Sequence, residues 1–171
     1  MLGMHQADVN NLVLDLMTYQ AFVAGLTHVP EMMASDGLTL QESLLRVLAE
    51  TCESSVAFAA IRGGEAGSLR VFARYPNPSP INLPERFQSP AVGAVIDSGR
   101  PDMILDATKA GHEVAPGVAT ALVVPYINRG AHCVVCVCNR DADSFARPEL
   151  GVPWTSHEMK MIQALVQLLP I

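Results

Sequence analysis

One stretch of this chain, residues 119–140 (ATALVVPYINRGAHCVVCVCNR), constrains the fold more than any other. Two apolar runs rich in β-branched residues, Ala119–Tyr126 and Ala131–Asn139, flank a short polar break that ends in Gly130. This pattern predicts a β-hairpin closed by a glycine-containing turn. Neither run alternates between apolar and polar residues, so we expect both faces to be covered and the hairpin to be central. Pro125 has no N–H to donate, so it should lie at a bulge or where a strand edge is unpaired.

The other elements follow from local patterns on either side of this hairpin. Two strands, Ser55–Arg62 and Ser68–Tyr75, are predicted to pair around a glycine-rich turn, and a short strand is predicted at Met103–Leu105. Residues 76–84 (PNPSPINLP) hold four prolines and should form an irregular connection. Helices are predicted after the capping residues Thr39, Ser89 and Thr155 or Ser156. The expected fold is α+β, with a central antiparallel sheet of about six strands flanked by helices.

Residues 1–30 are predicted to form an amphipathic helix that precedes a domain at residues 36–170. Apolar residues recur there at spacings of three and four, as in a heptad repeat, and Pro30 should end the helix before a linker at Glu31–Gly37. The helix could pack on its own domain or form a dimer. We favour the dimer, because a helix that precedes a complete domain has little intrachain surface to cover. The expected contact residues are Leu12, Leu16, Tyr19, Val23 and Leu26.

Charge and hydropathy exclude several classes of function. The formal net charge is -6, only 16% of residues are charged, and Lys and Arg form no cluster, which disfavours binding to nucleic acid or to anionic membranes. No apolar run approaches the roughly 20 residues that span a bilayer. The N-terminus lacks the basic start and apolar core of a signal peptide. We therefore expect a cytoplasmic protein that contacts neither membrane nor nucleic acid.

The cysteines are expected to be buried, reduced core residues. Cys133, Cys136 and Cys138 lie on one predicted strand, where disulfide geometry between them is excluded. His132, Cys136 and Cys138 share a strand face, but same-face neighbours are about 6.5–7 Å apart, too far for thiolates that share a zinc ion. We therefore expect no metal site and no catalytic residue.

Four segments in the correct order resemble the GAF domain family. Leu44–Ala60 is similar to the opening helix and first strand of the family, Pro90–Asp106 to a helix that ends in a Gly-Arg-Pro turn, Ala121–Cys138 to its hairpin, and Trp154–Glu158 to the start of its last helix. The resemblance covers residues 38–170. It departs from the family at Val134, which replaces a glycine, and in the longer connection at residues 141–153.

The resemblance implies a signal-transduction module that senses a small molecule and is usually a homodimer. The ligand would bind between the sheet and residues 76–118, where a few polar groups should converge against apolar walls. The candidate ligand-binding residues are Arg74, Tyr75, Phe87, Ser89, Asp106, His112 and Thr120. Neither the ligand nor a cofactor is identified by the sequence. The resemblance also implies a structural ion pair between Arg140 and Glu158, which would tie the hairpin to the last helix.

Two alternatives remain. A GAF-fold protein can act without ligand, as a dimerisation or protein-interaction module; the distinguishing feature is whether residues 76–118 enclose a polar-lined cavity or collapse onto the sheet. Some GAF-fold proteins of this length are thiol-dependent reductases of free methionine sulfoxide. No cysteine lies in residues 76–90 or 106–118, which would cover the pocket, so we expect no enzymatic activity.

Overall fold

The computed structural model describes residues 5–65, 68–141, 143 and 151–170. Most of the predicted connection at residues 141–153, and the first residues of the predicted N-terminal helix, lie outside this part of the chain. The described elements are β1 (Ser54–Arg62), β2 (Ser68–Tyr75), β3 (Arg86–Gln88), β4 (Asp102–Ile104), β5 (Ala121–Asn128) and β6 (Ala131–Arg140), with the helices α1 (Gln6–Leu26), α2 (Val29–Ser35), α3 (Leu40–Thr51), α4 (Pro90–Ser98) and α5 (Ser156–Leu165).

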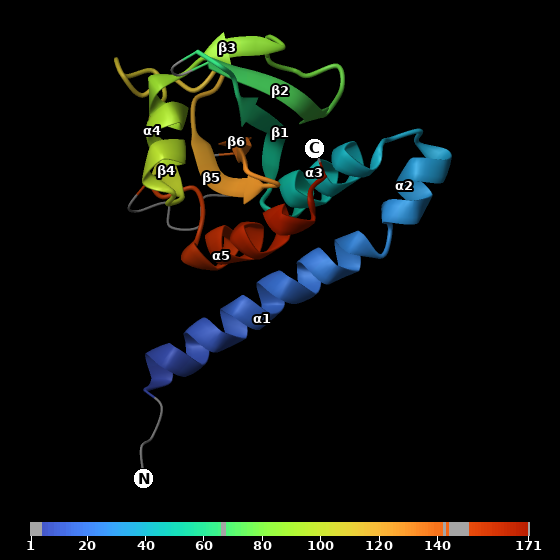
Figure 1. Ribbon diagram of the computed structural model, residues 1–171. Coiled ribbons are helices and arrows are strands. Elements are labelled where there is room, and N and C mark those ends of the chain that lie inside the picture. Colours follow the sequence, from blue (N-terminus) through green and yellow to red (C-terminus); the bar gives the residue numbers. More distant parts are fainter. Residues whose placement is uncertain (1–4, 66–67, 142, 144–150, 171) are drawn as a thin grey trace.

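The six strands form one sheet in the order β3-β2-β1-β6-β5-β4. Every neighbouring pair is antiparallel, which confirms the predicted α+β class with a central antiparallel sheet. The outermost strands, β3 and β4, are only three residues long, and short edge strands present few unpaired backbone groups to other chains. Figure 1 shows the sheet with the helices packed around it.

The predicted hairpin is formed by β5 and β6 and lies inside the sheet. Asn128 pairs with Ala131, so Arg129 and Gly130 make a two-residue turn, and both have positive φ (49° and 80°). A turn with two positive φ values matches the right-handed twist of the strands it joins. Strand β4 pairs with β5 only at residues 121–123, so Pro125 lies beyond the end of β4. The sheet therefore loses no backbone hydrogen bond to β4 because Pro125 lacks an N–H.

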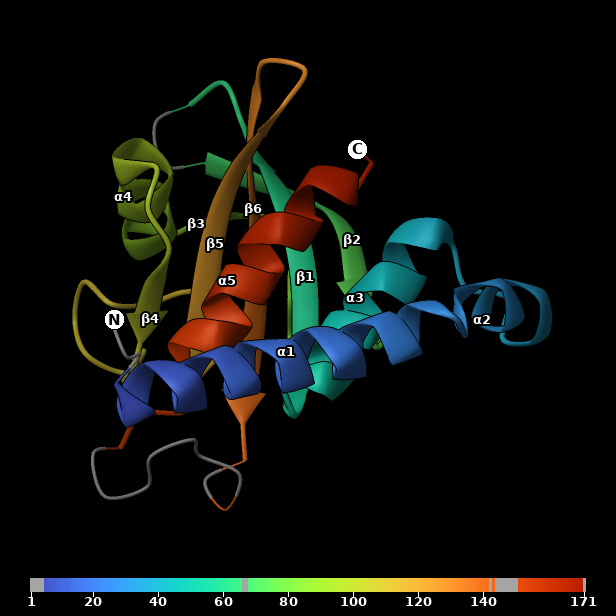
Figure 2. The ribbon, with the colours of Figure 1, turned by 90° about the horizontal axis from the view of Figure 1, so that it is seen from below.

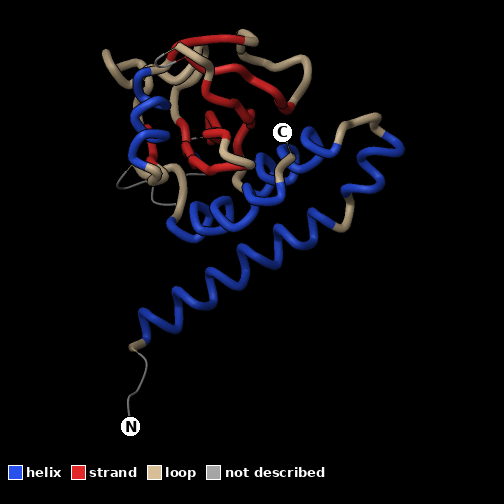
Figure 3. The backbone as a smooth tube through the Cα atoms, viewed as in Figure 1, coloured by secondary structure: helices blue, strands red, loops and turns tan. Residues whose placement is uncertain are grey.

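The two faces of the sheet are buried by different elements (Figure 3). On one face α1, α3 and α5 cover side chains of β1, β5 and β6, with the fully buried Trp154. On the other face α4 and residues 81–118 cover Phe58, Val123 and Val134. Because side chains alternate along a strand, β6 supplies Cys133 to the first core and Cys136 and Cys138 to the second.

Capping chemistry places the helix starts where the sequence predicts them. Thr39 and Thr155 begin α3 and α5 with complete capping boxes, in which Glu42 and Glu158 reach back to the backbone of the capping residue. Ser89 caps α4, and Gly99 ends it with a φ of 65°.

Two predictions about local structure are wrong. The N-terminal helix ends at Leu26 and not at Pro30, and residues Glu31–Gly37 are largely not a linker, because Val29–Ser35 form α2. Pro30 lies in the first turn of α2, where its missing N–H costs no hydrogen bond. Strand β3 follows the proline-rich segment directly and was not predicted, because three residues are too few to show a period.

Helix α1 runs across the outside of α5 and α3, and both Figure 1 and Figure 2 show this arrangement. Among its residues only Phe22 is buried. Gly25 lets the helix approach α3 closely, since a Cβ at this position would lie 2.7 Å from a methyl group of Val47. By length and composition alone, the helical residues 6–35 are long and apolar enough to cross a membrane. This finding differs from the sequence analysis, which expected no apolar segment of that length.

Candidate functional site

The sheet face expected to hold a ligand is filled by apolar side chains. Residues 81–118 contribute Leu83, Val92, Val95, Val114 and Val118 to the second core, and all five are buried against the sheet. A ligand in this position needs space and convergent polar groups. The described segment is instead packed onto the sheet, the arrangement that the sequence analysis associated with an interaction module.

Two of the predicted ligand residues hold this segment in place. Arg74 donates a hydrogen bond from Nη1 to the carbonyl oxygen of Leu83 (2.7 Å). The buried Ser89 accepts from the backbone N–H of Val92 at the start of α4 (3.2 Å) and donates to the carbonyl oxygen of Glu113 (2.7 Å). Both side chains therefore satisfy backbone groups of the covering segment.

Tyr75 and Phe87 lie on opposite faces of the sheet. Tyr75 pairs with Ala57, so it points toward the first core, where the Arg46 guanidinium lies 5.9 Å from the centre of its ring. Phe87 packs edge-to-face on Phe58, with 5.9 Å between ring centres, in the second core. Adjacent residues on a strand face opposite ways, so Arg74 and Tyr75 cannot line one pocket.

The remaining predicted residues do not converge either. Asp106 accepts hydrogen bonds from the backbone and the side chain of Thr108, and these bonds hold the pKa of its carboxyl below the ordinary value. The hydroxyl of Thr120 is buried and has no hydrogen-bond partner among the described residues. His112 is exposed and lines a cleft beside α4.

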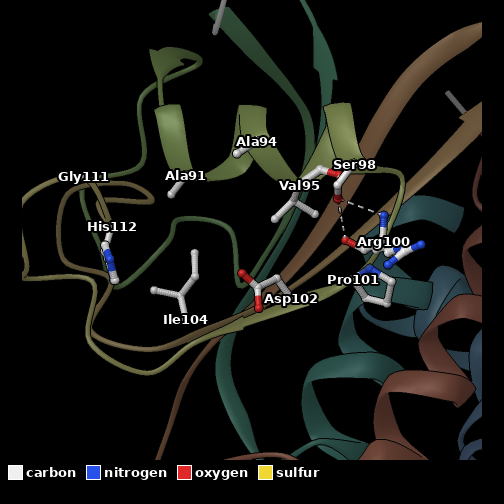
Figure 4. Close-up of a pocket in the computed structure, with 10 residues that line it drawn as sticks. All are labelled: Ala91, Ala94, Val95, Ser98, Arg100, Pro101, Asp102, Ile104, Gly111 and His112. Atoms are coloured by element: carbon white, nitrogen blue, oxygen red, sulfur yellow. Dashed lines mark hydrogen bonds between the residues drawn. The ribbon is translucent and has the colours of Figure 1, made fainter.

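This α4 cleft is an open hollow of about 370 Å³ between α4, β4 and residues 111–112 (Figure 4). Ala91, Ala94, Val95 and Ile104 form its apolar walls. Figure 4 shows Arg100 at one end, His112 at the other and Asp102 between them. The sequence analysis missed both residues, although Arg100 lies in the Gly-Arg-Pro turn that it identified and Asp102 follows that turn directly.

The side of α1 that carries Val9, Leu12, Leu16, Tyr19 and Val23 is left exposed by the domain and is a second candidate site. Leu12, Leu16 and Val23 are 50%, 54% and 55% exposed. Together with the exposed Val9 and Tyr19 they repeat at spacings of three and four, and at about 100° per residue they share one side of the helix. Leu26, the fifth predicted dimer residue, is half-buried and packs against the domain beside Phe22.

A polar contact fixes the orientation of α1 on the domain. The Asp15 carboxylate contacts Nδ1 of the buried His157 in the first turn of α5, and Lys160 lies 3.7 Å away. The hydrogen bond from His157 lowers the pKa of Asp15 from its ordinary value of 3.8. Asp15 is a single acid within the run LVLDLM, and this interruption was the available signal for the contact.

Arg140 and Glu158 form an ion pair between β6 and the start of α5. Arg140 Nη1 lies 2.6 Å from Glu158 Oε1, and its Nη2 lies 2.9 Å from Glu53. The side chains of Arg140 and Glu158 are only 9% and 8% exposed, so the ion pair is nearly buried. The sequence analysis predicted the pair but not its burial. The pair ties the hairpin to the last helix.

The cysteines show no arrangement suited to thiol chemistry. Cys52, Cys133, Cys136 and Cys138 are free and buried, and burial raises the pKa of each thiol. A nucleophilic cysteine needs an accessible thiolate. Within the described ranges, no three His, Cys, Asp or Glu side chains are grouped so as to hold a metal ion.

Solved structures similar to this chain are GAF domains and GAF-like enzymes. One is the GAF domain of a phosphoenolpyruvate-protein phosphotransferase from Coxiella burnetii, with 12% identity and a TM-score of 0.61, covering 88% of this chain and 90% of that one. The corresponding domain from Acinetobacter has 14% identity and a TM-score of 0.55, covering 84% and 89%. The free methionine-R-sulfoxide reductase of Neisseria meningitidis, solved with its substrate, has 12% identity and a TM-score of 0.61, covering 86% and 85%.

No protein-family model and no curated protein matches the chain. The structural likeness nevertheless confirms the fold expected from the sequence resemblance: the chain has a GAF-like fold.

Proposed function

We propose that this GAF-like chain is a regulatory module that works as a homodimer joined through α1. The observation that carries the proposal is the exposed apolar face of α1, formed by Val9, Leu12, Leu16, Tyr19 and Val23. Burying one large apolar side chain stabilises an assembly by roughly 1.5–3 kcal/mol. Five such residues on each of two chains offset the cost of losing independent motion.

A second copy of the chain fits this face better than a lipid bilayer does. Helices that lie on membranes carry Lys and Arg on their polar side, and residues 5–45 contain neither. Insertion across a bilayer would bury Asp8 and break the contact of Asp15 with His157. The spacings of three and four suit a helix pair related by a two-fold axis. We therefore also propose that the protein is cytoplasmic.

Hydrogen–deuterium exchange tests this proposal at the level of the interface. The amides of α1 should exchange more slowly at micromolar protein concentration than after dilution into the nanomolar range, because dimer formation protects an otherwise exposed helix. Those of α2, which lies outside the proposed interface, should exchange at the same rate at both concentrations. Equal exchange of α1 at the two concentrations would contradict the proposal, provided that the protein is mostly monomeric at the lower one.

The α4 cleft favours a second function, the sensing of a small molecule. It combines apolar walls with a cation, an acid and an exposed histidine, the composition that orients a zwitterionic ligand. We expect Arg100→Ala to abolish binding of any small molecule that co-purifies with the wild type in native mass spectrometry, and to leave the melting temperature nearly unchanged. Retention of that molecule by the variant would remove Arg100 from the site.

Reductase activity is not part of the proposal. All four cysteines are buried, and an accessible thiolate is the first requirement of that chemistry. The shared fold with the Neisseria meningitidis enzyme does not supply one.

A further inference from the structure

Two arginines face each other across the β2–β3 pair at one corner of the sheet. Arg70 and Arg86 are direct partners in the antiparallel register. Like charges placed directly opposite on neighbouring strands destabilise the pair. Among the described residues, neither guanidinium forms an ion pair with a carboxylate. The nearby Arg62 differs, because its Nη2 lies 2.5 Å from Asp97.

The two arginines line a cleft of about 440 Å³, here called the arginine cleft. Its other lining residues are Ile61, Arg62, Gly63, Gly64, Glu65 and Ser68. The turn on one side is closed by a hydrogen bond from the N–H of Gly63 to the carbonyl oxygen of Ser68 (2.8 Å). Alternation along β2 places Ser68 on the same face as Arg70.

The arginine cleft is separate from the α4 cleft. Arg70 also pairs with Ile61, which packs against the core beneath α3 and α5. The α4 helix covers the opposite face of the sheet. Glu65 is the one carboxylate among the residues lining the arginine cleft, so a positive charge remains there in a chain whose formal net charge is -6.

We infer that the arginine cleft binds a small, multiply charged oxyanion whose oxygens bridge Arg70 and Arg86. Each guanidinium presents parallel N–H donors that match two oxygens of a phosphate or carboxylate group. A single carboxylate offers one pair of oxygens for a bidentate contact, whereas a diphosphate can offer a separate pair to each of the two guanidinium groups. A phosphorylated ligand is therefore the favoured class. The anion would also neutralise the repulsion between the two strands, and the cleft volume lies within the range of small-molecule sites.

Isothermal titration calorimetry with pyrophosphate tests this inference, with citrate as a polycarboxylate and sodium chloride at matched ionic strength. The wild type should bind pyrophosphate saturably, and Arg70→Gln should weaken binding by about tenfold or more, because it removes charge-assisted hydrogen bonds. Lys109→Gln, which removes an exposed positive charge from the loop between β4 and β5 and lines neither cleft, should bind like the wild type. Binding of citrate alone would support the oxyanion site and assign it to a polycarboxylate.

A second readout separates a binding role from a structural one. Without any anion, Arg70→Gln should melt at a higher temperature than the wild type, since the repulsion with Arg86 is gone. A structural arginine would show the reverse. The inference is overturned if neither anion binds the wild type saturably, if Arg70→Gln binds as tightly as the wild type, or if this variant is less stable than the wild type in the absence of anions.

Discussion

The double variant Leu12→Glu, Leu16→Glu is expected to be monomeric at concentrations where the wild type is a dimer. Each leucine buried in the interface contributes roughly 1.5–3 kcal/mol, and the variant removes two from each chain while adding facing negative charges. The dissociation constant should rise at least about 1000-fold. Sedimentation velocity over a range of concentrations measures this change directly.

The control for this variant is Leu14→Glu on the same helix. Leu14 is also exposed, and at about 100° per residue it lies nearly opposite the side that carries Leu12 and Leu16. Leu14→Glu makes the same chemical change at one position, so it should lower helix stability by the same amount per substitution while leaving the dimer intact. If Leu14→Glu dissociates the protein as strongly as the double variant, the interface is not the proposed face of α1.

Replacing Glu158 by alanine is expected to cause the largest loss of stability among the single changes considered. Glu158 accepts from Arg140 (2.6 Å) and from the backbone N–H of Thr155 (2.9 Å), which begins α5. Among the described residues, its removal leaves the nearly buried Arg140 with the exposed Glu53 as its one carboxylate partner. Breaking a buried pair by removing one member costs about 3–5 kcal/mol. Equilibrium unfolding in urea should show this loss.

Glu42→Ala is the matched control, because Glu42 occupies the same position in the capping box of α3. It accepts from the backbone N–H of Thr39 (2.8 Å) and has no arginine partner among the described residues. Loss of one such hydrogen bond costs about 0.5–1.5 kcal/mol. Equal losses for Glu158→Ala and Glu42→Ala would show that the ion pair with Arg140 adds nothing to the cap.

Much of the fold could be predicted because it depends on local chemistry. The β5–β6 hairpin follows from two apolar runs around a turn that needs positive φ, and Gly130 supplies one of the two positions. The starts of α3, α4 and α5 follow from a hydroxyl that accepts a backbone hydrogen bond. These signals involve residues within a few positions of each other, so the sequence carries them without the rest of the structure.

The candidate site could not be predicted in the same way, because it depends on which residues fill space. A ligand pocket and a packed core need the same kinds of side chains, and only the structure shows that Leu83, Val114 and Val118 occupy the sheet face. Arg74 and Tyr75 are equally plausible pocket residues by their position at the end of a strand. The register of β2 on β1 places their side chains on opposite faces of the sheet. The arginine cleft depends on the pairing of β2 with β3, a strand too short to predict.

The break between α1 and α2 was missed for a related reason. Pro30 was read as a helix end, but a proline is equally suited to the first turn of a new helix. Which of the two applies depends on the burial of Val29 and Met32 against α3, a tertiary contact.

The central claim is that two copies of this chain associate, and the molar mass of the wild type in solution tests it most directly. Multi-angle light scattering at micromolar concentration should give twice the chain mass of 18.3 kDa. A mass equal to one chain across the micromolar range would contradict the account and leave the apolar face of α1 without the proposed partner.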